Sequence, residues 1–332
     1  MDRDIASVAG ASARTTSGHL IGKIAFPVAA AVTLLPFVSP GAALLMGMLL
    51  ALTVGNPYAV ESSRFVSPLL QISVIGLGAG MNLAVVGRVG AHGFVYTVVG
   101  ITLTMTVGLL LGRLIRTGRD TSILLCVGTA ICGGSAIAAV APTIRARSHD
   151  VSVALATVFF LNAVALFLFP WIGHRVGLNQ TQFGLWSALA IHDTSSVVGA
   201  AMQYGARALE IATTVKLTRA LWIVPMTIVI GSLWKSNRGG DESKQKVKRP
   251  WFILGFLAAA ALVTWVPALK PAGHLVFQGA QRSLVVTLFL IGGGLSRAAL
   301  ATVGQRPLVQ GFLLWILMAS ATLGAIVMGW IS

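Results

Sequence analysis

The stretch GTAICGGSA, residues 128–136, lies in the middle of an apolar segment, residues 121–144, that is long enough to cross a lipid bilayer. Its two adjacent glycines and its serine are poor helix formers. Unwound backbone inside a membrane is tolerated only where protein or a water-filled cavity meets its polar groups. The stretch therefore predicts a helix broken at the bilayer midplane, which is how many transporters build a binding site.

The same pattern recurs once, 160 residues further along the chain. ICGG at 131–134 and AAVA at 138–141 correspond to IGGG at 291–294 and AALA at 298–301. A second broken helix is therefore predicted in the apolar segment 274–297. The alternative is chance similarity, because small residues are common in membrane helices and mediate their packing.

Composition defines the class of the protein. Of its 332 residues, 56% are hydrophobic and only 10% are charged, whereas soluble domains carry about 25% charged residues. The mean hydropathy is +0.85. The net charge of +15 does not indicate nucleic-acid binding, because the basic residues lie mainly in short loops between apolar spans. Cys126 and Cys132 suggest neither a disulfide framework nor a metal site, and no cofactor is expected.

The apolar spans predict an all-α polytopic membrane protein with about 11 transmembrane helices. The two broken spans are five spans apart, so they would run in opposite directions and belong to a 5+5 inverted repeat with an extra N-terminal helix. Basic loop residues favour a cytoplasmic N-terminus and a periplasmic C-terminus. The predicted units are a cytoplasmic tail at 1–19, an extra helix at 20–38, a first repeat at 40–177, a second repeat at 180–332 and a basic cytoplasmic loop at 234–249.

The two breaks are the first candidate site. The half-helices after them would begin near Gly134 and Gly294, and their free N–H groups and dipoles suit an anion. Packing kinks are the alternative reading. The candidate binding residues at the breaks are Cys132, Gly133, Gly134, Ser135, Gly293 and Gly294.

Charged residues in the spans are the second candidate. His192 and Asp193 lie in the span 181–203 and could carry a proton, or form a structural pair. Lys216 and Arg219 lie on one face of the next helix and could pair with Asp193 or Glu210, or bind an anionic substrate. A proton or a sodium ion would be the coupling ion.

Other residues allow further readings. Asn162 follows the first break by one span and could support the crossing point. Ser135 and His192 could in principle form an intramembrane hydrolase dyad, although no enzyme is expected. The glycine-rich face at 76–80 could pack within the monomer or between the two copies of a homodimer.

Residues 131–139, 190–198 and 212–222 resemble the signature segments of the YeiH family, bacterial inner-membrane proteins commonly labelled sulfate exporters. The family is grouped with bile-acid symporters and sodium/proton antiporters. The resemblance implies a core domain of spans 4–6 and 9–11 that moves against a panel of spans 2, 3, 7 and 8. His192, Asp193, Lys216 and Arg219 would then face the core from the panel. The antiporters carry acidic residues where this chain has Asn162.

The favoured prediction is a secondary transporter that exports a small anion such as sulfate, sulfite or an organic sulfonate. The anion would bind between the half-helix N-termini, near Lys216 and Arg219, and His192 and Asp193 would couple its movement to protons. A cation antiporter or sodium-coupled symporter using Asp193, Asn162 and the break carbonyls is the alternative. An anion channel and the hydrolase are the remaining options.

Overall fold

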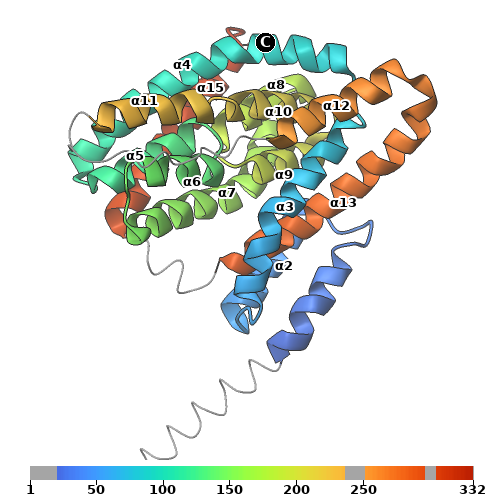
Figure 1. Ribbon diagram of the computed structural model, residues 1–332, viewed down its shortest axis with the longest axis horizontal. Helices are drawn as coiled ribbons and strands as arrows, with labels where there is room; N and C mark the ends of the chain where they lie inside the picture. The colour runs from blue at the N-terminus through green and yellow to red at the C-terminus, as the bar shows by residue number, and fades with distance from the viewer. Residues whose placement is uncertain (1–20, 236–250, 296–303, 332) are drawn as a thin grey trace, which may run out of the picture.

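The computed structural model describes residues 21–235, 251–295 and 304–331, which are almost entirely helical (Figure 1). The predicted tail at 1–19 and most of the predicted loop at 234–249 lie outside these residues. Helices satisfy their own backbone hydrogen bonds, as a lipid environment requires. Within the described residues, five segments are long and apolar enough to cross a membrane: Tyr96–Ile115, Ser148–Val176, Ala206–Leu233, Pro267–Gly294 and Gln305–Val327.

One group of helices packs around α13, Lys270–Gly294. A methyl group added to Gly47 would lie 2.1 Å from the carbonyl oxygen of Phe289, and one added to Gly292 would lie 2.2 Å from that of Leu44. The backbones of α2 and α13 are therefore in direct contact. The other members of this group are the N-terminal helix Ile21–Val32, α2 (Pro40–Thr53), α3 (Ala59–Gly78) and α12 (Trp251–Trp265).

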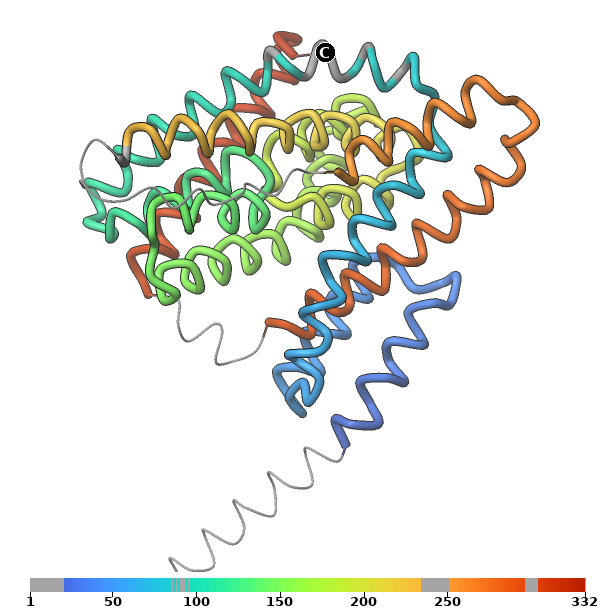
Figure 2. Tube along the Cα trace, in the orientation of Figure 1, coloured from blue at the N-terminus to red at the C-terminus, as the bar shows by residue number. Residues whose placement is uncertain are grey.

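The second group contains the remaining described helices, and Figure 2 traces their path. The long helix α4 packs against α5, α10 and α15 and also touches α12 of the first group. The members are α4 (Leu83–Ile115), α5 (Arg119–Ala130), α6 (Gly134–Thr143), α7 (Ser148–Val176), α8 (Gln180–Ala190), α9 (Thr194–Tyr204), α10 (Ala206–Ala220), α11 (Ile223–Lys235) and α15 (Gln305–Val327).

Helix α13 corrects one prediction. The IGGG pattern at 291–294 predicts a break, but the helix continues without interruption through Gly292 and Gly293 to Gly294. The physical reason is packing: the missing side chain at Gly292 lets α2 approach, and the helix keeps its backbone hydrogen bonds. Residues 296–303, where a following half-helix was predicted, lie outside the described residues.

The predicted span 181–203 is also not one continuous helix, because it is interrupted at residues 191–193. Asp193 has an extended backbone, and its carboxylate accepts hydrogen bonds from the N–H groups of Ser195 and Ser196. Aspartate is a strong N-cap residue, so it begins a new helix here. The grouping implied by the resemblance also changes: the helices around His192 and Lys216 pack in the same group as the first break, not in an opposing panel.

Candidate functional site

Helices α5 and α6 form a hairpin, called hairpin 1, that folds back on itself. A methyl group on Gly128 of α5 would lie 2.9 Å from the Ile137 side chain of α6. The beginning of α5 and the end of α6 line one cavity, together with the first turn of α7. Thr121 of α5 donates a 2.7 Å hydrogen bond to Asp150 of α7. Both ends of hairpin 1 therefore lie beside the N-terminal end of α7.

Helices α8 and α9 form hairpin 2, whose ends lie together at the C-terminal end of α7. The hydroxyl of Tyr204 donates to the carbonyl oxygen of Leu178 at 2.6 Å. The rings of Tyr204 and Phe183 stack with their centroids 3.8 Å apart. The N–H of Arg207 donates to the side-chain oxygen of Gln180 at 2.9 Å.

The two hairpins meet tip to tip halfway along α7. The ideal Cβ position of Gly133 lies 3.4 Å from Asp193 and 3.4 Å from Val158 of α7. The N–H of His192 donates to the Asn162 side chain of α7 at 3.1 Å. Each hairpin therefore enters and leaves at one end of α7, so residues 121–144 and 181–203 each fold back at their middle instead of running on in one direction, as was predicted for them.

The tip of hairpin 1, residues 131–133, depends on glycine. Gly133 has φ +66° and ψ −124°, a conformation that residues with a side chain rarely adopt. It precedes α6 without a side-chain cap, and the first N–H groups of a helix have no partner within it. Ser135 in this first turn is exposed, whereas Cys132 is buried in the turn. The positive end of the α6 dipole is therefore left for another group.

The tip of hairpin 2, residues 191–193, is capped by its own side chain. Asp193 accepts from the N–H of Ser195 at 3.0 Å, from the N–H of Ser196 at 3.3 Å and from the Ser195 hydroxyl. A carboxylate at a helix N-terminus is stabilised by the dipole and by these hydrogen bonds. Here the positive end of the helix already has an anionic partner.

Lys216 and Arg219 of α10 are fully buried and bind the other two helix ends at the tips. The Lys216 ammonium donates to the carbonyl oxygen of Ile191 at 2.7 Å. Arg219 donates to the carbonyl oxygens that end both first arms: those of Ala188 and Leu189 in α8, at 2.9 and 2.6 Å, and those of Thr129 and Ala130 in α5. Cations at helix C-termini are favourable. One arginine therefore joins the two hairpins.

Among the described residues, the ion pairs that were one of the two readings for these cations do not form. Lys216 makes no ion pair with Asp193 in the described structure, and Glu210 is paired with Arg207 at 2.6 Å instead. The tips thus hold two buried cations and one carboxylate, Asp193. The local sum of formal charges is positive, which favours a negatively charged ligand.

Several buried polar groups around the tips have no hydrogen-bond partner among the described residues. They include both ring nitrogens of His192, the Asn162 side-chain nitrogen and the Arg219 Nε. The hydroxyls of Thr129 and Thr213 share this property, although nothing in the sequence marks these two residues. Unsatisfied buried groups are costly, so such a cluster is a candidate ligand or water site. Because the His192 ring has no partner, no Ser135–His192 dyad is formed.

Gly293 and Gly294 do not join this cluster. A methyl group on Gly293 would lie 2.6 Å from the Phe26 ring, and the Gly293 carbonyl accepts a 3.0 Å hydrogen bond from Asn56. The predicted site residues that do come together are Cys132, Gly133, Asn162, His192, Asp193, Lys216 and Arg219, with Gly134 and Ser135 in the adjoining turn.

Comparisons with known proteins identify relatives of this chain. A family model described as Conserved hypothetical protein 698 matches residues 18–311. UPF0324 membrane protein Bd1437 of Bdellovibrio bacteriovorus is 62% identical over 311 residues, 94% of this chain and 96% of its own. UPF0324 membrane protein GSU2818 of Geobacter sulfurreducens is 48% identical over 314 residues, 95% of this chain and 99% of its own. No solved structure matches. The chain is thus a multi-pass membrane protein and belongs to the Conserved hypothetical protein 698 family, that of the UPF0324 membrane proteins.

Proposed function

We propose that the protein is a secondary active transporter that exports a small oxyanion, of the sulfate, sulfite or organic sulfonate class, by alternating access. One observation carries the proposal: two hairpins from opposite ends of α7 meet at its middle, and the α6 N-terminus at their junction is uncapped. A midplane site reached from both sides, with a half-helix N-terminus facing it, suits an anionic solute.

The charges at the junction support an anion as the substrate. Lys216 and Arg219 hold the negative ends of α5 and α8, so these ends do not repel an anion bound nearby. The unpartnered Asn162 nitrogen and Arg219 Nε are donors that an oxyanion could accept from. The YeiH resemblance, with its sulfate-exporter label, supports the same substrate class and the direction of transport.

Proton coupling is the part of the proposal assigned to His192 and Asp193. The two residues are adjacent at the tip of hairpin 2, and both are buried. Ionisable groups at this depth are rare in membranes and commonly mark ion or proton pathways. Movement of hairpin 1 past them would link anion release to a change in their protonation.

The hairpins also support the orientation that places the N-terminus in the cytoplasm. Since hairpin 1 begins and ends at one side, Arg145 and Arg147 share that side with Arg119. Arg175, at the other end of α7, lies on the opposite side with hairpin 2. This arrangement concentrates basic residues further on the cytoplasmic side of a bacterial inner membrane, in agreement with the positive-inside rule.

The test is anion flux in liposomes that contain the purified protein. Radiolabelled sulfate, sulfite and methanesulfonate efflux is measured with and without a pH gradient, for the native chain and for Lys216→Ala and Asp193→Asn. Arg282→Ala is the matched control, because Arg282 also donates to backbone carbonyls, of residues 35, 36 and 38, but far from the tips. Flux that is unchanged in both tip variants contradicts the proposal.

A sodium- or proton-coupled cation transporter is the second candidate, favoured by the Asp193 carboxylate at the junction. Against it, the carbonyls of Ala130 and Ile191, which could complete a cation site, already accept from Arg219 and Lys216. Sodium dependence of flux or of the melting temperature, in the absence of anion dependence, would favour this candidate. Flux without saturation or coupling would favour a channel.

A further inference from the structure

The imidazole ring of His192, at the tip of hairpin 2, makes no hydrogen bond within the described residues. The residue is 1% exposed, and neither Nδ1 nor Nε2 has a partner there. Its backbone is fixed, because its N–H donates to the Asn162 side chain at 3.1 Å. Buried polar groups normally have partners, so a ring that is held in place and left unpaired is available to a ligand or to a proton.

The charged and titratable groups around this ring come from several elements. Lys216 and Arg219 of α10 act on the ring as positive charges. The next residue, Asp193, is held at the N-terminus of α9 by two backbone N–H groups, which stabilise its carboxylate. The Cys132 thiol at the tip of hairpin 1 lies near the same groups and adds no charge. Helix α7 contributes the neutral Asn162.

The formal charges of this cluster predict how many protons accompany an anion. With a neutral ring, the two cations of α10 and the Asp193 carboxylate leave one net positive charge. A monovalent anion brings the total to zero. A divalent anion brings it to one net negative charge, which a proton on His192 cancels. Net charge is costly in a buried cluster, so the neutral combinations are favoured.

The geometry places the proposed anion close to the ring. The ideal Cβ position of Gly133 lies 3.4 Å from Asp193, the residue after His192. The uncapped N-terminus of α6 begins directly after Gly133. An anion bound at this N-terminus is therefore beside the tip of hairpin 2, where its oxygens could accept from a protonated imidazole.

We propose that His192 takes up one proton together with each divalent anion, whereas a monovalent anion binds without a proton. The proton enters from the water on the side where the anion binds and leaves with the anion, and no bond of the anion itself changes. Both kinds of anion then cross the membrane with one net negative charge. The inference rests on the proposed transport function and adds to it the proton-carrying residue, the direction of coupling and the number of protons.

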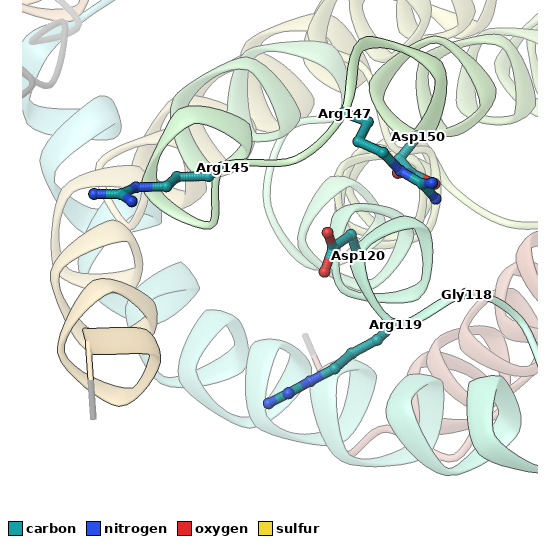
Figure 3. A pocket seen from close by; sticks show the side chains of 6 residues that line it. All are labelled: Gly118, Arg119, Asp120, Arg145, Arg147 and Asp150. Atoms are coloured by element: carbon teal, nitrogen blue, oxygen red, sulfur yellow. The ribbon is translucent and has the colours of Figure 1, made fainter. Parts of the chain in front are cut away.

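A carboxylate at the other end of hairpin 1 provides a matched control. Figure 3 shows Asp150 beside Arg147 at the base of this hairpin. Asp150 accepts from Arg147 Nε at 2.9 Å and from the Thr121 hydroxyl at 2.7 Å. Because Arg147 offsets its charge locally, Asp150 does not enter the sum of charges at the tips.

The experiment counts protons by isothermal titration calorimetry of the purified full chain in a neutral detergent. Sulfate, which is divalent, and methanesulfonate, which is monovalent, are each titrated in buffers of different ionisation enthalpy, at two pH values about one unit apart. The variants are His192→Gln and Asp193→Asn. Their matched controls are His174→Gln, an exposed histidine near the end of α7, and Asp150→Asn.

Sulfate is expected to take up about one proton and to bind up to about tenfold more tightly for each unit by which the pH falls. Methanesulfonate is expected to take up none. His192→Gln should bind sulfate more weakly and without proton uptake, because the acceptor of the proton is gone. Asp193→Asn should also bind sulfate without proton uptake, because the remaining cations already balance a divalent anion. His174→Gln and Asp150→Asn should keep the native proton count.

Three results overturn the inference while leaving anion transport intact: sulfate binding without proton uptake, equal uptake with both anions, or uptake that persists in His192→Gln. If neither anion binds to the native chain, the proposed function fails and the inference fails with it. The comparison of the two anions on the native chain decides the question even where a variant does not fold.

Discussion

The two hairpins share a pattern and differ at one helix end. Ala130-Ile131 and Ser135 of hairpin 1 correspond to Ala190-Ile191 and Ser195 of hairpin 2, at an offset of 60 residues. Arg219 binds the end of the first arm in both. The second arm of hairpin 2, however, begins with a carboxylate cap, while that of hairpin 1 begins at a bare glycine.

This difference points to a role for the uncapped N-terminus of α6 in binding an anion. In hairpin 2 the Asp193 carboxylate fills the position where an anion would meet the N–H groups of α9. In hairpin 1 the equivalent position before α6 has no side chain to fill it. We infer that the transported anion takes at α6 the place that Asp193 takes at α9. Hairpin 2 would then be the closed tip, and hairpin 1 the one that opens.

The largest expected effect concerns the existence of the hairpins. Single cysteines replace Arg119, Ser148 and Arg207, all of which are exposed, while the native Cys126 and Cys132 are buried. A membrane-impermeant thiol reagent should label positions 119 and 148 from one side only and position 207 from the other side. Labelling of 119 and 148 from opposite sides would mean that the segment 121–144 crosses the membrane. It would then not be a hairpin, and the comparison of hairpin 1 with hairpin 2 would not hold.

The next largest effect is expected from Arg219→Ala. The substitution leaves the buried carbonyls at the ends of α5 and α8 without their donor, so the free energy of unfolding should fall by about 3 kcal/mol or more. Anion flux should be lost. Arg219→Lys should recover only part of either property, since an ammonium lacks the fork that reaches both helices. Arg282→Ala should lower the melting temperature without removing flux, and equal loss of flux in both would contradict the special role of Arg219.

Substitution of the glycine at the tip of hairpin 1 should have an intermediate effect on stability and flux. Gly133→Ala has room for its methyl group but forces a side chain into a backbone conformation with φ +66°, at a cost of about 1–3 kcal/mol. Both stability and flux should decrease. Gly294→Ala is the matched control, because it has ordinary φ and no atom within 4 Å of the added methyl. If Gly294→Ala impairs flux as much as Gly133→Ala, the functional tips are those of the original repeat prediction.

Asp193→Asn should have the smallest effect on stability, below about 1 kcal/mol, because asparagine is an equally good N-cap residue. It should nevertheless remove the dependence of flux on a pH gradient and increase the apparent anion affinity, since one negative charge near the site is lost. Flux measured at two pH values, with and without a gradient, checks this. An unchanged pH dependence would remove Asp193 from the coupling mechanism and leave His192 to be tested in the same way.

Part of the site could be predicted from the sequence because membrane physics makes certain residues conspicuous. A glycine pair in an apolar span, and His192, Asp193, Lys216 and Arg219 within such spans, are all costly in lipid and therefore call for a structural or functional reason. The structure brings these residues together. Thr129 and Thr213 gave no such signal, because threonine is ordinary in membrane helices and often bonds its own backbone.

The partner of the first break could not be predicted in the same way. Glycine serves equally well to unwind a helix, as at Gly133, or to let two helices touch, as at Gly292. The 160-residue repeat treated both as breaks. The match between the two tips, residues 130–135 and 190–195, was present in the sequence. Only three of these six positions hold the same residue, which is too few to distinguish the match from chance.

The sequence by itself determined that the chain is helical and embedded in a membrane, that its helix breaks near Gly133, and which charged residues lie at that depth. Hydropathy and the energetic cost of burying charge are properties of the residues, so they are readable without a fold. Only the tertiary structure decided that each broken segment turns back on itself and that Arg219 joins the two tips. Those features depend on which backbone carbonyls come within reach of one guanidinium, and residues 90 positions apart in the chain meet only after folding.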